Sequence, residues 1–393
     1  MKKVEASALK TLGILGGGQL AEMISKAAKR LGFKVAILAQ SPDSPAAKLA
    51  DQLFIGSFNN RAALFSIADV CDVLTLENEF VDSQLLADLE QAGYCVYPSS
   101  SCLALIQDKF LQKRELSQQG IPVPRFAEVS GLKEAVFAFQ KWGGRGVVIK
   151  KRRNAYDGRG NAAAFSEGEI KKAWELLKGD SEPLYIEEFC PFEKELAVIV
   201  SVSRKNEAAV YPVAETIQEN HVCRAVLVPA AADKEISDRA SEIARKAVEG
   251  IGGVGSMGVE LFLQKDGEIL VNEISPRVHN SGHYTIEACE SSQFENHVRG
   301  VFGLPLGSSA LKEKAAAMVN LLGVKKGDGT PEGLDEAKAV LGASVHIYGK
   351  KESFPGRKMG HVTALGENSA QALKTAQQAA ALIRFGARST LSS

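Results

Sequence analysis

Two glutamates face each other in a predicted hairpin. Residues 259–274 alternate apolar and polar side chains around Asp266-Gly267, a dipeptide typical of two-residue hairpin turns. If these two residues form the turn, Glu260 lies directly opposite Glu273. Opposed carboxylates repel each other, and a divalent cation held between them would remove that repulsion. Ligands that are all oxygen favour Mg²⁺, or Mn²⁺, bound together with the phosphates of a nucleotide.

The same register places Phe262 and Val271 on one face of the hairpin with the glutamates, so we expect this face to be partly buried. The alternative is an exposed ribbon on which both glutamates are solvated.

A glycine-rich turn near the N-terminus is a candidate anion site. Residues 16–20, Gly-Gly-Gly-Gln-Leu, stand between a short apolar run and an amphipathic helical pattern. A helix N-terminus presents unpaired amides, and glycines let a ligand approach them, so a phosphate is the expected guest. The turn also fits a loose dinucleotide pattern, but the second predicted strand ends in Gln40 instead of an acidic residue. A nicotinamide dinucleotide is therefore disfavoured, although Asp43 follows closely. A simple tight turn is the remaining alternative.

Two basic segments and two acidic residues could contact a nucleotide. Lys150 ends an apolar strand and precedes the basic loop of residues 152–160, which could fold over a polyphosphate. The alternative is a solvated surface loop. Glu187 and Glu195 could hold an adenine amine or ribose hydroxyls. A second basic patch, residues 350–351 with 357–358, could bind another phosphate or be a solvated turn.

A polar loop follows the hairpin directly. Residues 276–284 read Pro-Arg-Val-His-Asn-Ser-Gly-His-Tyr, and the Arg, His and Asn side chains offer hydrogen-bond donors to a polar, anionic substrate beside the metal. Each histidine by itself is more often a structural hydrogen-bonding residue than a catalyst.

The elements that must position these residues begin with an α/β unit. Short apolar runs at residues 11–15, 35–38, 53–55 and 73–76 alternate with helical or polar stretches, as in a parallel sheet covered on both faces. A charged helical stretch over residues 107–119 ends at a Gly/Pro-rich connector. We predict an N-terminal α/β domain (1–105), a central lid domain (106–189) and a C-terminal domain (190–393) with a small terminal subdomain (about 325–393).

The composition excludes several protein classes. Lys plus Arg and Asp plus Glu each number 47 among 393 residues, so a net charge of zero gives no overall attraction to nucleic acids or membranes. The six scattered cysteines lack metal-ligand spacing and are predicted to be buried, reduced thiols. No stretch approaches the roughly 20 apolar residues that span a bilayer, and we expect a cytoplasmic protein.

Five motifs in this order resemble the 5-(carboxyamino)imidazole ribonucleotide synthase family, ATP-grasp ligases of purine biosynthesis. The resemblance covers nearly the whole chain. The motifs within residues 276–283 and 355–361 are specific to that family, whereas the glycine turn and the paired glutamates are shared by ATP-grasp enzymes generally. The motifs are Gly16-Gly17-Gly18-Gln19-Leu20, Tyr156-Asp157-Gly158-Arg159-Gly160, Asn272-Glu273-Ile274, Pro276-Arg277-Val278-His279-Asn280-Ser281-Gly282-His283 and Pro355-Gly356-Arg357-Lys358-Met359-Gly360-His361.

The resemblance implies a fold and a reaction. The fold is ATP-grasp, of the α/β and α+β classes, with an N-terminal parallel-sheet domain, a small central lid and a larger C-terminal α+β domain. The reaction joins bicarbonate to the exocyclic amine of 5-aminoimidazole ribonucleotide, and ATP is cleaved to ADP and phosphate through carboxyphosphate. The family also suggests a homodimer.

The resemblance further implies roles for individual residues. Glu260 and Glu273 would bridge magnesium ions. Asp157 would orient the attacking amine or accept its proton, Tyr156 belongs to the same closing loop, and Lys350 would steady the carboxylate or the nucleotide. Residues implied to bind ATP are Lys109, Lys150, Gly158, Gly160, Glu187, Glu195 and Asn272. Residues implied to hold the ribonucleotide are Gly17, Gly18, Gln19, Glu77, Arg277, His279, Asn280, Ser281, Arg357 and Lys358.

Three positions depart from the family pattern. Asn154 and Ala155 replace the two glycines that usually precede Tyr-Asp-Gly, which would stiffen that loop. The usual Glu-Phe-Glu-Asn order after the fourth strand becomes Glu-Asn-Glu-Phe at residues 77–80, which puts contacts from this segment in doubt. Gln40 replaces the usual Asp at the end of the second strand.

Three alternatives remain open from the sequence. Another ATP-grasp ligase, such as a formate-dependent ribonucleotide transformylase or a carboxylase subunit, would share the ATP site but would not need the loop of residues 277–283. An NAD-dependent dehydrogenase would leave the paired glutamates unexplained. A non-catalytic nucleotide-binding protein is disfavoured because Lys150, Asp157, Glu260 and Glu273 are all present.

Overall fold

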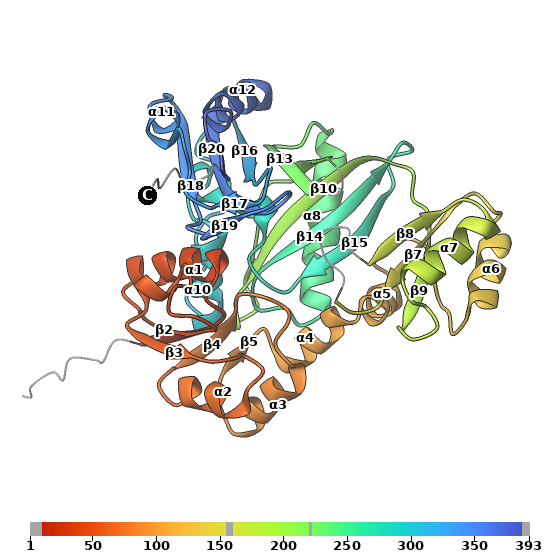
Figure 1. Cartoon of the computed structure of the whole chain (residues 1–393), viewed down its shortest axis with the longest axis horizontal. Coiled ribbons are helices and arrows are strands. Elements are labelled where there is room, and N and C mark those ends of the chain that lie inside the picture. Colours follow the sequence, from red (N-terminus) through yellow and green to blue (C-terminus); the bar gives the residue numbers. More distant parts are fainter. Residues whose placement is uncertain (1–9, 155–159, 220–221, 387–393) are drawn as a thin grey trace, which may run out of the picture.

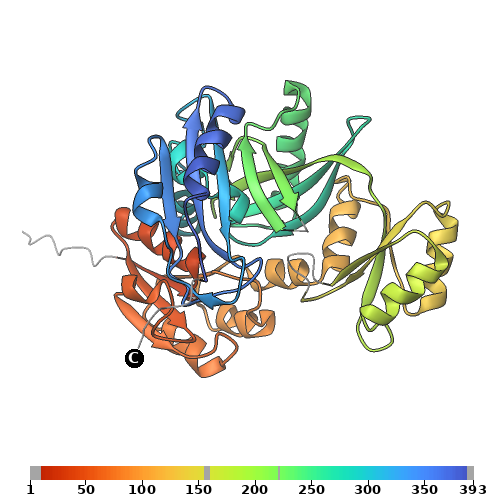
Figure 2. The same cartoon turned by 45° about the horizontal axis from the view of Figure 1, so that its top comes forward.

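Three main sheets, joined by helices, make up the fold. The structure is a computed structural model that describes residues 10–154, 160–219 and 222–386. In Figure 1 the N-terminal unit lies at the lower left, the central unit at the right, and the large C-terminal sheet between and above them. Figure 2 shows from a second direction that the central unit stands to one side of the other two.

The N-terminal unit is a parallel sheet in the order β3-β2-β1-β4-β5. The four predicted strands are confirmed, and all four strand pairs are parallel. The short β5 was not predicted because only two residues of it pair. The strands are β1 (Thr11–Leu15), β2 (Lys34–Ala39), β3 (Gln52–Ile55), β4 (Val73–Leu76) and β5 (Val96–Tyr97). The helices are α1 (Gln19–Arg30), η1 (Ala47–Leu49), α2 (Arg61–Ala68), α3 (Ser83–Gln91), α4 (Ser100–Gln107) and α5 (Lys109–Gln118).

The central unit is an antiparallel sheet in the order β6-β9-β7-β8. Its helices cover one face, where Ile149 and Ile186 join their apolar core. Because side chains alternate along a strand, the neighbouring Lys150 and Glu187 point to the opposite face. The elements are β6 (Phe126–Glu128), α6 (Leu132–Lys141), β7 (Val147–Lys151), β8 (Asn161–Ala164), α7 (Glu167–Leu176) and β9 (Leu184–Glu188).

The C-terminal unit is a large sheet in the order β15-β14-β10-β12-β13-β16-β20-β18, with β11 paired to β10. Helix α8 covers the core face of β10, β14 and β15. The first strands and helices are β10 (Phe192–Val202), β11 (Ala208–Val210), β12 (Ala214–Glu219), β13 (Val222–Val228), α8 (Lys234–Gly250), β14 (Gly255–Gln264), β15 (Ile269–Ser275), η2 (Asn280–Gly282), α9 (Thr285–Ala288) and α10 (Gln293–Phe302).

The remaining elements extend this sheet. Strands β18 and β20 pair within it, so the predicted terminal subdomain contributes strands to the large sheet, while β17 and β19 form a separate pair. The domain boundaries stay predictions. The elements are β16 (Ala315–Leu322), β17 (Gly327–Asp328), α11 (Leu334–Lys338), β18 (Ala343–Ile347), β19 (Glu352–Ser353), β20 (Lys358–Gly366) and α12 (Ser369–Ala380).

Helix α10 fastens the C-terminal unit to the N-terminal sheet. Its Phe294, Val298 and Val301 share one apolar core with Leu12 and Ile24 of the N-terminal unit. Figure 1 shows α10 beside α1. This shared core holds the glycine turn before α1 next to the loops of the large sheet, so residues far apart in sequence can form one site.

The structure tests two predictions made from the composition: that the cysteines are buried and that no segment spans a membrane. The six cysteines, all within the described ranges, form no disulfide bonds, and Cys102 and Cys289 are buried as predicted. The prediction of buried thiols is wrong for Cys95, which is exposed, and holds only in part for the half-buried Cys71, Cys190 and Cys223. In the described ranges, no helix has the length and apolar character needed to cross a membrane.

Candidate active site

The hairpin places Glu260 opposite Glu273, as predicted, but its loop length and its register differ from the prediction. The predicted two-residue loop is wrong: the Gln264 amide donates to the Glu268 carbonyl at 2.8 Å, which leaves a three-residue loop ending in Gly267 with φ of 83°. Asn272 then forms a bulge that shifts the register back. The two one-residue changes cancel, and Glu260 still pairs with Glu273.

The bulge also changes which side chains share a face. Phe262 pairs with Leu270, whereas Val271 pairs with Leu261 and is buried in the core under α8. The prediction that Phe262 and Val271 share a face is therefore wrong. Phe262 is half-buried because its ring stacks on that of Phe192 at 4.6 Å.

The paired glutamates carry more negative charge than their neighbours neutralise. Lys109 Nζ lies 3.0 Å from Glu273. Glu260 has longer contacts, with Asn272 Nδ2 at 3.4 Å and His279 Nε2 at 3.5 Å. His279 adds little positive charge at neutral pH, because burial lowers its pKa to about 3. Burial and the charges of Glu273 and Glu195 raise the pKa of Glu260 to about 8. Two carboxylates and an amide fit a hard divalent cation, which would take the place of the proton that the raised pKa favours on Glu260.

The glycine turn forms a pocket that already contains a carboxylate. The pocket has a volume of about 200 Å³, and its lining includes Gly17, Gly18, Gln40 and Glu77. Glu77 accepts a hydrogen bond from the Gly18 amide at 2.6 Å. A side chain at residue 18 would collide with Glu77, since a Cβ atom there would lie 2.0 Å from its carboxylate oxygen. In this structure the amide at the start of α1 donates to the Glu77 carboxyl group, and the predicted phosphate at this turn stays a prediction.

Glu79 is a functional candidate that the sequence argument missed. Arg277 Nε donates to Glu79 at 2.6 Å, and Nη2 donates to its other oxygen at 3.1 Å. This two-bond pair connects the segment after β4 to the loop after β15. Although burial opposes ionisation, Arg277 lowers the pKa of Glu79 to about 2. The signal was present in the motif itself, because the usual Glu-Phe-Glu-Asn order and the Glu-Asn-Glu-Phe of residues 77–80 both have a glutamate in the third place.

The Glu79–Arg277 pair should stabilise the protein at neutral pH and lose that effect in acid. Since the folded pKa of about 2 lies below the ordinary value of 4.5, the contribution is complete above pH 4.5 and is lost as the pH falls toward 2. We expect Glu79→Gln to lower the free energy of unfolding by roughly 3 kcal/mol at pH 7. Urea unfolding of both proteins between pH 7 and pH 3 measures the difference, which should shrink with acidity. A constant difference would contradict this prediction.

Lys150 and Glu187 contact each other directly on the inner face of the central sheet. Glu187 is only 2% exposed, and its carboxylate lies 2.7 Å from Lys150 Nζ and 3.3 Å from Lys113 Nζ. It also accepts a hydrogen bond from Tyr185 at 2.9 Å. Burial raises the pKa of Glu187, but Lys113 and Lys150 outweigh burial and lower it to about 2. Glu187 therefore orients Lys150 in this structure. Lys113, one helical turn after Lys109, was not predicted.

Helix α5 connects the central unit to the hairpin. Asp108 caps the helix by accepting from the amides of residues 110 and 111, and it also pairs with Arg152 at 2.8 Å. Lys113 donates to the Val271 carbonyl at 2.9 Å. Arg152 is thus held at the base of the basic loop. Gly160 closes that loop, and its carbonyl accepts from the Lys151 amide. Tyr156, Asp157 and Gly158 lie outside the described residues.

The polar loop after β15 is fixed by its own hydrogen bonds. His279 Nδ1 lies 2.8 Å from Ser281 Oγ, which turns Nε2 toward Glu260. The amides of Asn280 and Asn320 exchange two hydrogen bonds, at 3.0 and 2.8 Å. His279 and Ser281 thus lie beside Glu260, whereas Asn280 connects the loop to Asn320 of β16.

The second basic patch faces the same region. Lys350 Nζ donates to the Lys358 carbonyl at 2.7 Å, and its positive charge acts on Glu77. Lys358 lies close enough for its charge to act on Glu260 and His279. Arg357 donates to the Glu352 carbonyl at 2.6 Å and lies over the Phe354 ring. Gln19 begins α1 beside the pocket, and the charge of Glu195 acts on Glu260.

Comparison with known proteins gives consistent results along the chain. Residues 9–107 match the ribonucleotide synthetase preATP-grasp domain, residues 114–294 the ATP-grasp domain, and residues 316–375 the phosphoribosylaminoimidazole carboxylase C-terminal domain. The chain is 41% identical to the N5-carboxyaminoimidazole ribonucleotide synthase of Synechococcus elongatus, over 98% of this chain and 96% of that protein.

Solved structures agree with this match. The N5-carboxyaminoimidazole ribonucleotide synthetase of Thermotoga maritima superposes with a TM-score of 0.86 and 42% identity, over 96% of this chain and 99% of that one. An Aspergillus clavatus N5-carboxyaminoimidazole synthase, solved with ADP and 5-aminoimidazole ribonucleotide, has a TM-score of 0.86 and 35% identity over 94% of this chain and 98% of that one.

Proposed function

Because the chain belongs to the N5-carboxyaminoimidazole ribonucleotide synthase family of ATP-grasp enzymes, we propose that the residues around Glu260 and Glu273 form its active site. The chain is an ATP-dependent enzyme of purine biosynthesis that converts 5-aminoimidazole ribonucleotide with ATP and bicarbonate. The observation that carries the site assignment is the Glu260–Glu273 pair, which lies between Lys109 of α5 and His279 of the polar loop.

The phosphates of ATP would lie between the central sheet and the hairpin. Lys150, oriented by Glu187, and Lys109, held by Glu273, would bind them as point charges. Glu260, Glu273 and Asn272 would hold Mg²⁺, or Mn²⁺, which when bound would offset the charge of the phosphates. Bicarbonate would attack the terminal phosphoryl group, giving carboxyphosphate and ADP. The lysines would stabilise charge on the transferred group, so positioning and electrostatics do most of the work.

The ribonucleotide would bind on the other side of the glutamates. Arg277, held by Glu79, and the basic patch at Lys350 and Arg357 would offer positive charge to its phosphate. An anionic group could bind the Gly18 amide only after the Glu77 carboxyl group had moved away from it. If Glu77 stays in place, it would instead accept a hydrogen bond from the ribose.

Closure and the second chemical step involve residues outside the described ranges. Carboxyphosphate hydrolyses readily, so the loop with Tyr156 and Asp157 would exclude water, and Asp157 would orient the amine or take its proton. A homodimer stays a prediction of the family resemblance, and a cytoplasmic location stays a prediction from the composition.

Substrate-dependent ATP cleavage tests the proposal. ADP release is measured with ATP, magnesium and bicarbonate, with and without 5-aminoimidazole ribonucleotide. We expect strong stimulation by the ribonucleotide. ADP release that the ribonucleotide does not change would mean that the polar loop and the basic patch have been assigned to the wrong acceptor. No ADP release at all would contradict the assignment of the ATP site.

A further inference from the structure

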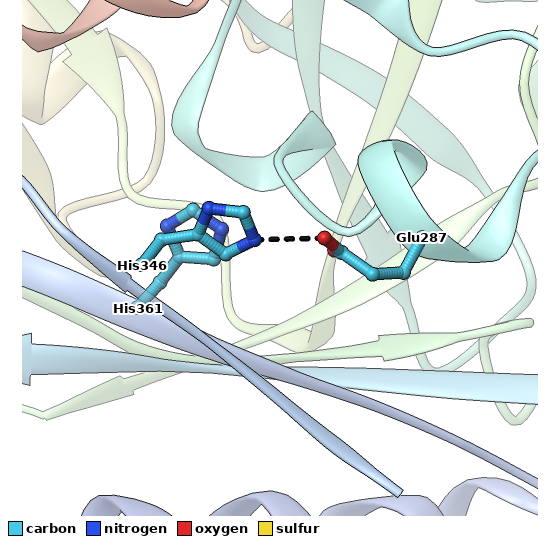
Figure 3. A group of neighbouring side chains, drawn as sticks. All are labelled: Glu287, His346 and His361. Carbon is cyan, nitrogen blue, oxygen red and sulfur yellow. Dashed lines mark hydrogen bonds and ion pairs between the residues drawn. The ribbon is translucent and has the colours of Figure 1, made fainter. Parts of the chain in front are cut away.

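Two histidines from neighbouring strands stack beside the active site, and the reaction described above does not use them. His346 of β18 and His361 of β20 are cross-strand partners. Their ring centroids lie 4.4 Å apart, and the ring planes differ by 10°. Figure 3 shows one ring behind the other, with His346 pointing at Glu287 of α9. His361 is fully buried, whereas the His346 side chain is 27% exposed, so the pair runs from the protein interior toward its surface.

Hydrogen bonds extend the stack in both directions. His346 Nε2 lies 2.7 Å from a Glu287 oxygen, and His361 Nδ1 lies 2.9 Å from the Tyr348 hydroxyl. Glu287, the two rings and Tyr348 therefore form a continuous chain of contacts. Each member restricts the rotation of the next, because a hydrogen bond or a stacked ring fixes the plane of its neighbour.

The chain of contacts leads to Lys350. Tyr348 is 2% exposed, and Lys350 Nζ lies 5.6 Å from the centroid of its ring. A cation at this distance from an aromatic ring is attracted to it. The Tyr348 amide donates to the Met359 carbonyl at 2.9 Å, so the pairing with β20 continues past the end of β18. His346 and Tyr348 therefore project on the same side of this extended stretch. At Gly349 the chain turns, with φ of 65°, and Lys350 follows directly, with its Nζ near the Tyr348 ring.

A metal ion is the competing explanation for this cluster. Donor atoms of Glu287, His346 and His361 lie within 4.8 Å of one another, and these residue types bind zinc. His361 Nε2 and one Glu287 oxygen have no hydrogen-bond partner among the described residues. Imidazole lone pairs lie in the ring plane, however, and the two stacked planes are nearly parallel. The lone pairs therefore run side by side and do not converge on one ion.

We propose that Glu287, His346, His361 and Tyr348 form a buried support that positions the Lys350 side chain for the ribonucleotide. The inference rests on the placement of Lys350 in the active site proposed above. The four residues are positioning residues, because they act through Lys350. Loss of the hydrogen bond between His361 and Tyr348 should therefore lower kcat/KM for the ribonucleotide.

Two variants remove that bond from opposite ends. Tyr348→Phe keeps the ring under Lys350, and His361→Phe keeps an aromatic ring against His346. We expect either variant to lower kcat/KM for 5-aminoimidazole ribonucleotide about tenfold, as misplacement of a binding group does, while KM for ATP stays unchanged. The double variant should lose no more than one single variant, because both remove the same bond. Thr363→Val is the matched control, since Thr363 is also buried on β20 and its hydroxyl has no partner among the described residues.

The Lys350→Met background separates the possible outcomes. In that background Tyr348→Phe should cause no further loss. An unchanged kcat/KM for Tyr348→Phe, or an equal loss with and without Lys350, would overturn the inference while leaving the active site assignment in place. Full activity of Lys350→Met would overturn the assignment of Lys350 itself. If the purified enzyme retains one equivalent of zinc and the His346→Ala variant retains none, the cluster is a metal site and the proposed support is wrong.

Discussion

Replacing Glu273 by glutamine should lower turnover by about a thousandfold or more while the protein stays folded. Glu273 pairs with Glu260 across the hairpin and contacts Lys109 at 3.0 Å. The substitution keeps the shape of the side chain but removes one of the two charges proposed to hold the magnesium ion. The remaining amide also binds Lys109 more weakly, so both the metal and a phosphate-binding lysine lose their partner.

The measurement is ribonucleotide-dependent ADP release, with the circular dichroism spectrum and the thermal midpoint as checks on folding. Glu268→Gln is the matched control, because Glu268 lies on the same hairpin next to the turn and is exposed. We expect the control to keep full activity. A folded Glu273→Gln enzyme with normal turnover would refute the assignment of the metal site.

Replacing Arg277 by methionine should lower kcat/KM for the ribonucleotide roughly a hundredfold, because a buried, hydrogen-bonded charge is lost from the substrate side of the site. KM for ATP should change little, since the proposed ATP contacts lie on α5, β7 and the hairpin. The single variant also leaves the Glu79 carboxylate without its partner, and part of any loss could come from this damage.

A second substitution separates the two causes. Arg277→Met combined with Glu79→Gln removes both charges of the pair, so the thermal midpoint should recover toward that of the wild type. Binding of the ribonucleotide should stay weak if Arg277 contacts it. Recovery of both the midpoint and kcat/KM would show that Arg277 has only a structural role.

Local sequence patterns were sufficient for several parts of the fold. Apolar runs predicted the four strands β1 to β4. Strands β1, β2 and β4 are buried, and such strands need nearly continuous apolar residues, whereas the edge strand β3 is largely exposed. The glycine turn before α1 was predicted as well, and there the Gly18 amide donates to the Glu77 carboxyl group, while the predicted phosphate stays a prediction. The opposition of Glu260 and Glu273 was predicted as well, although two compensating errors in the hairpin led to it.

The partners of charged groups could not be predicted in the same way. Glu79 is separated from Arg277 by 198 positions in the sequence, and Lys113 is separated from Val271 by 158. Hydrophobic periodicity reports which face of an element is buried, but it does not report which other element covers that face. The packing of α5 against the edge of β15, and of α10 against the N-terminal sheet, brings these groups together.

The sequence by itself determined the family and which residue types were predicted for the site: an acidic pair for a divalent cation, lysines for phosphates, and a family-specific loop for the ribonucleotide. Only the tertiary structure decided how each group is held, with Glu187 orienting Lys150, Glu79 holding Arg277, and stacked histidines lying behind Lys350. The reason is physical. Residue types and local backbone preferences are properties of short segments, whereas the burial and pairing of a charge depend on which distant segments pack against it.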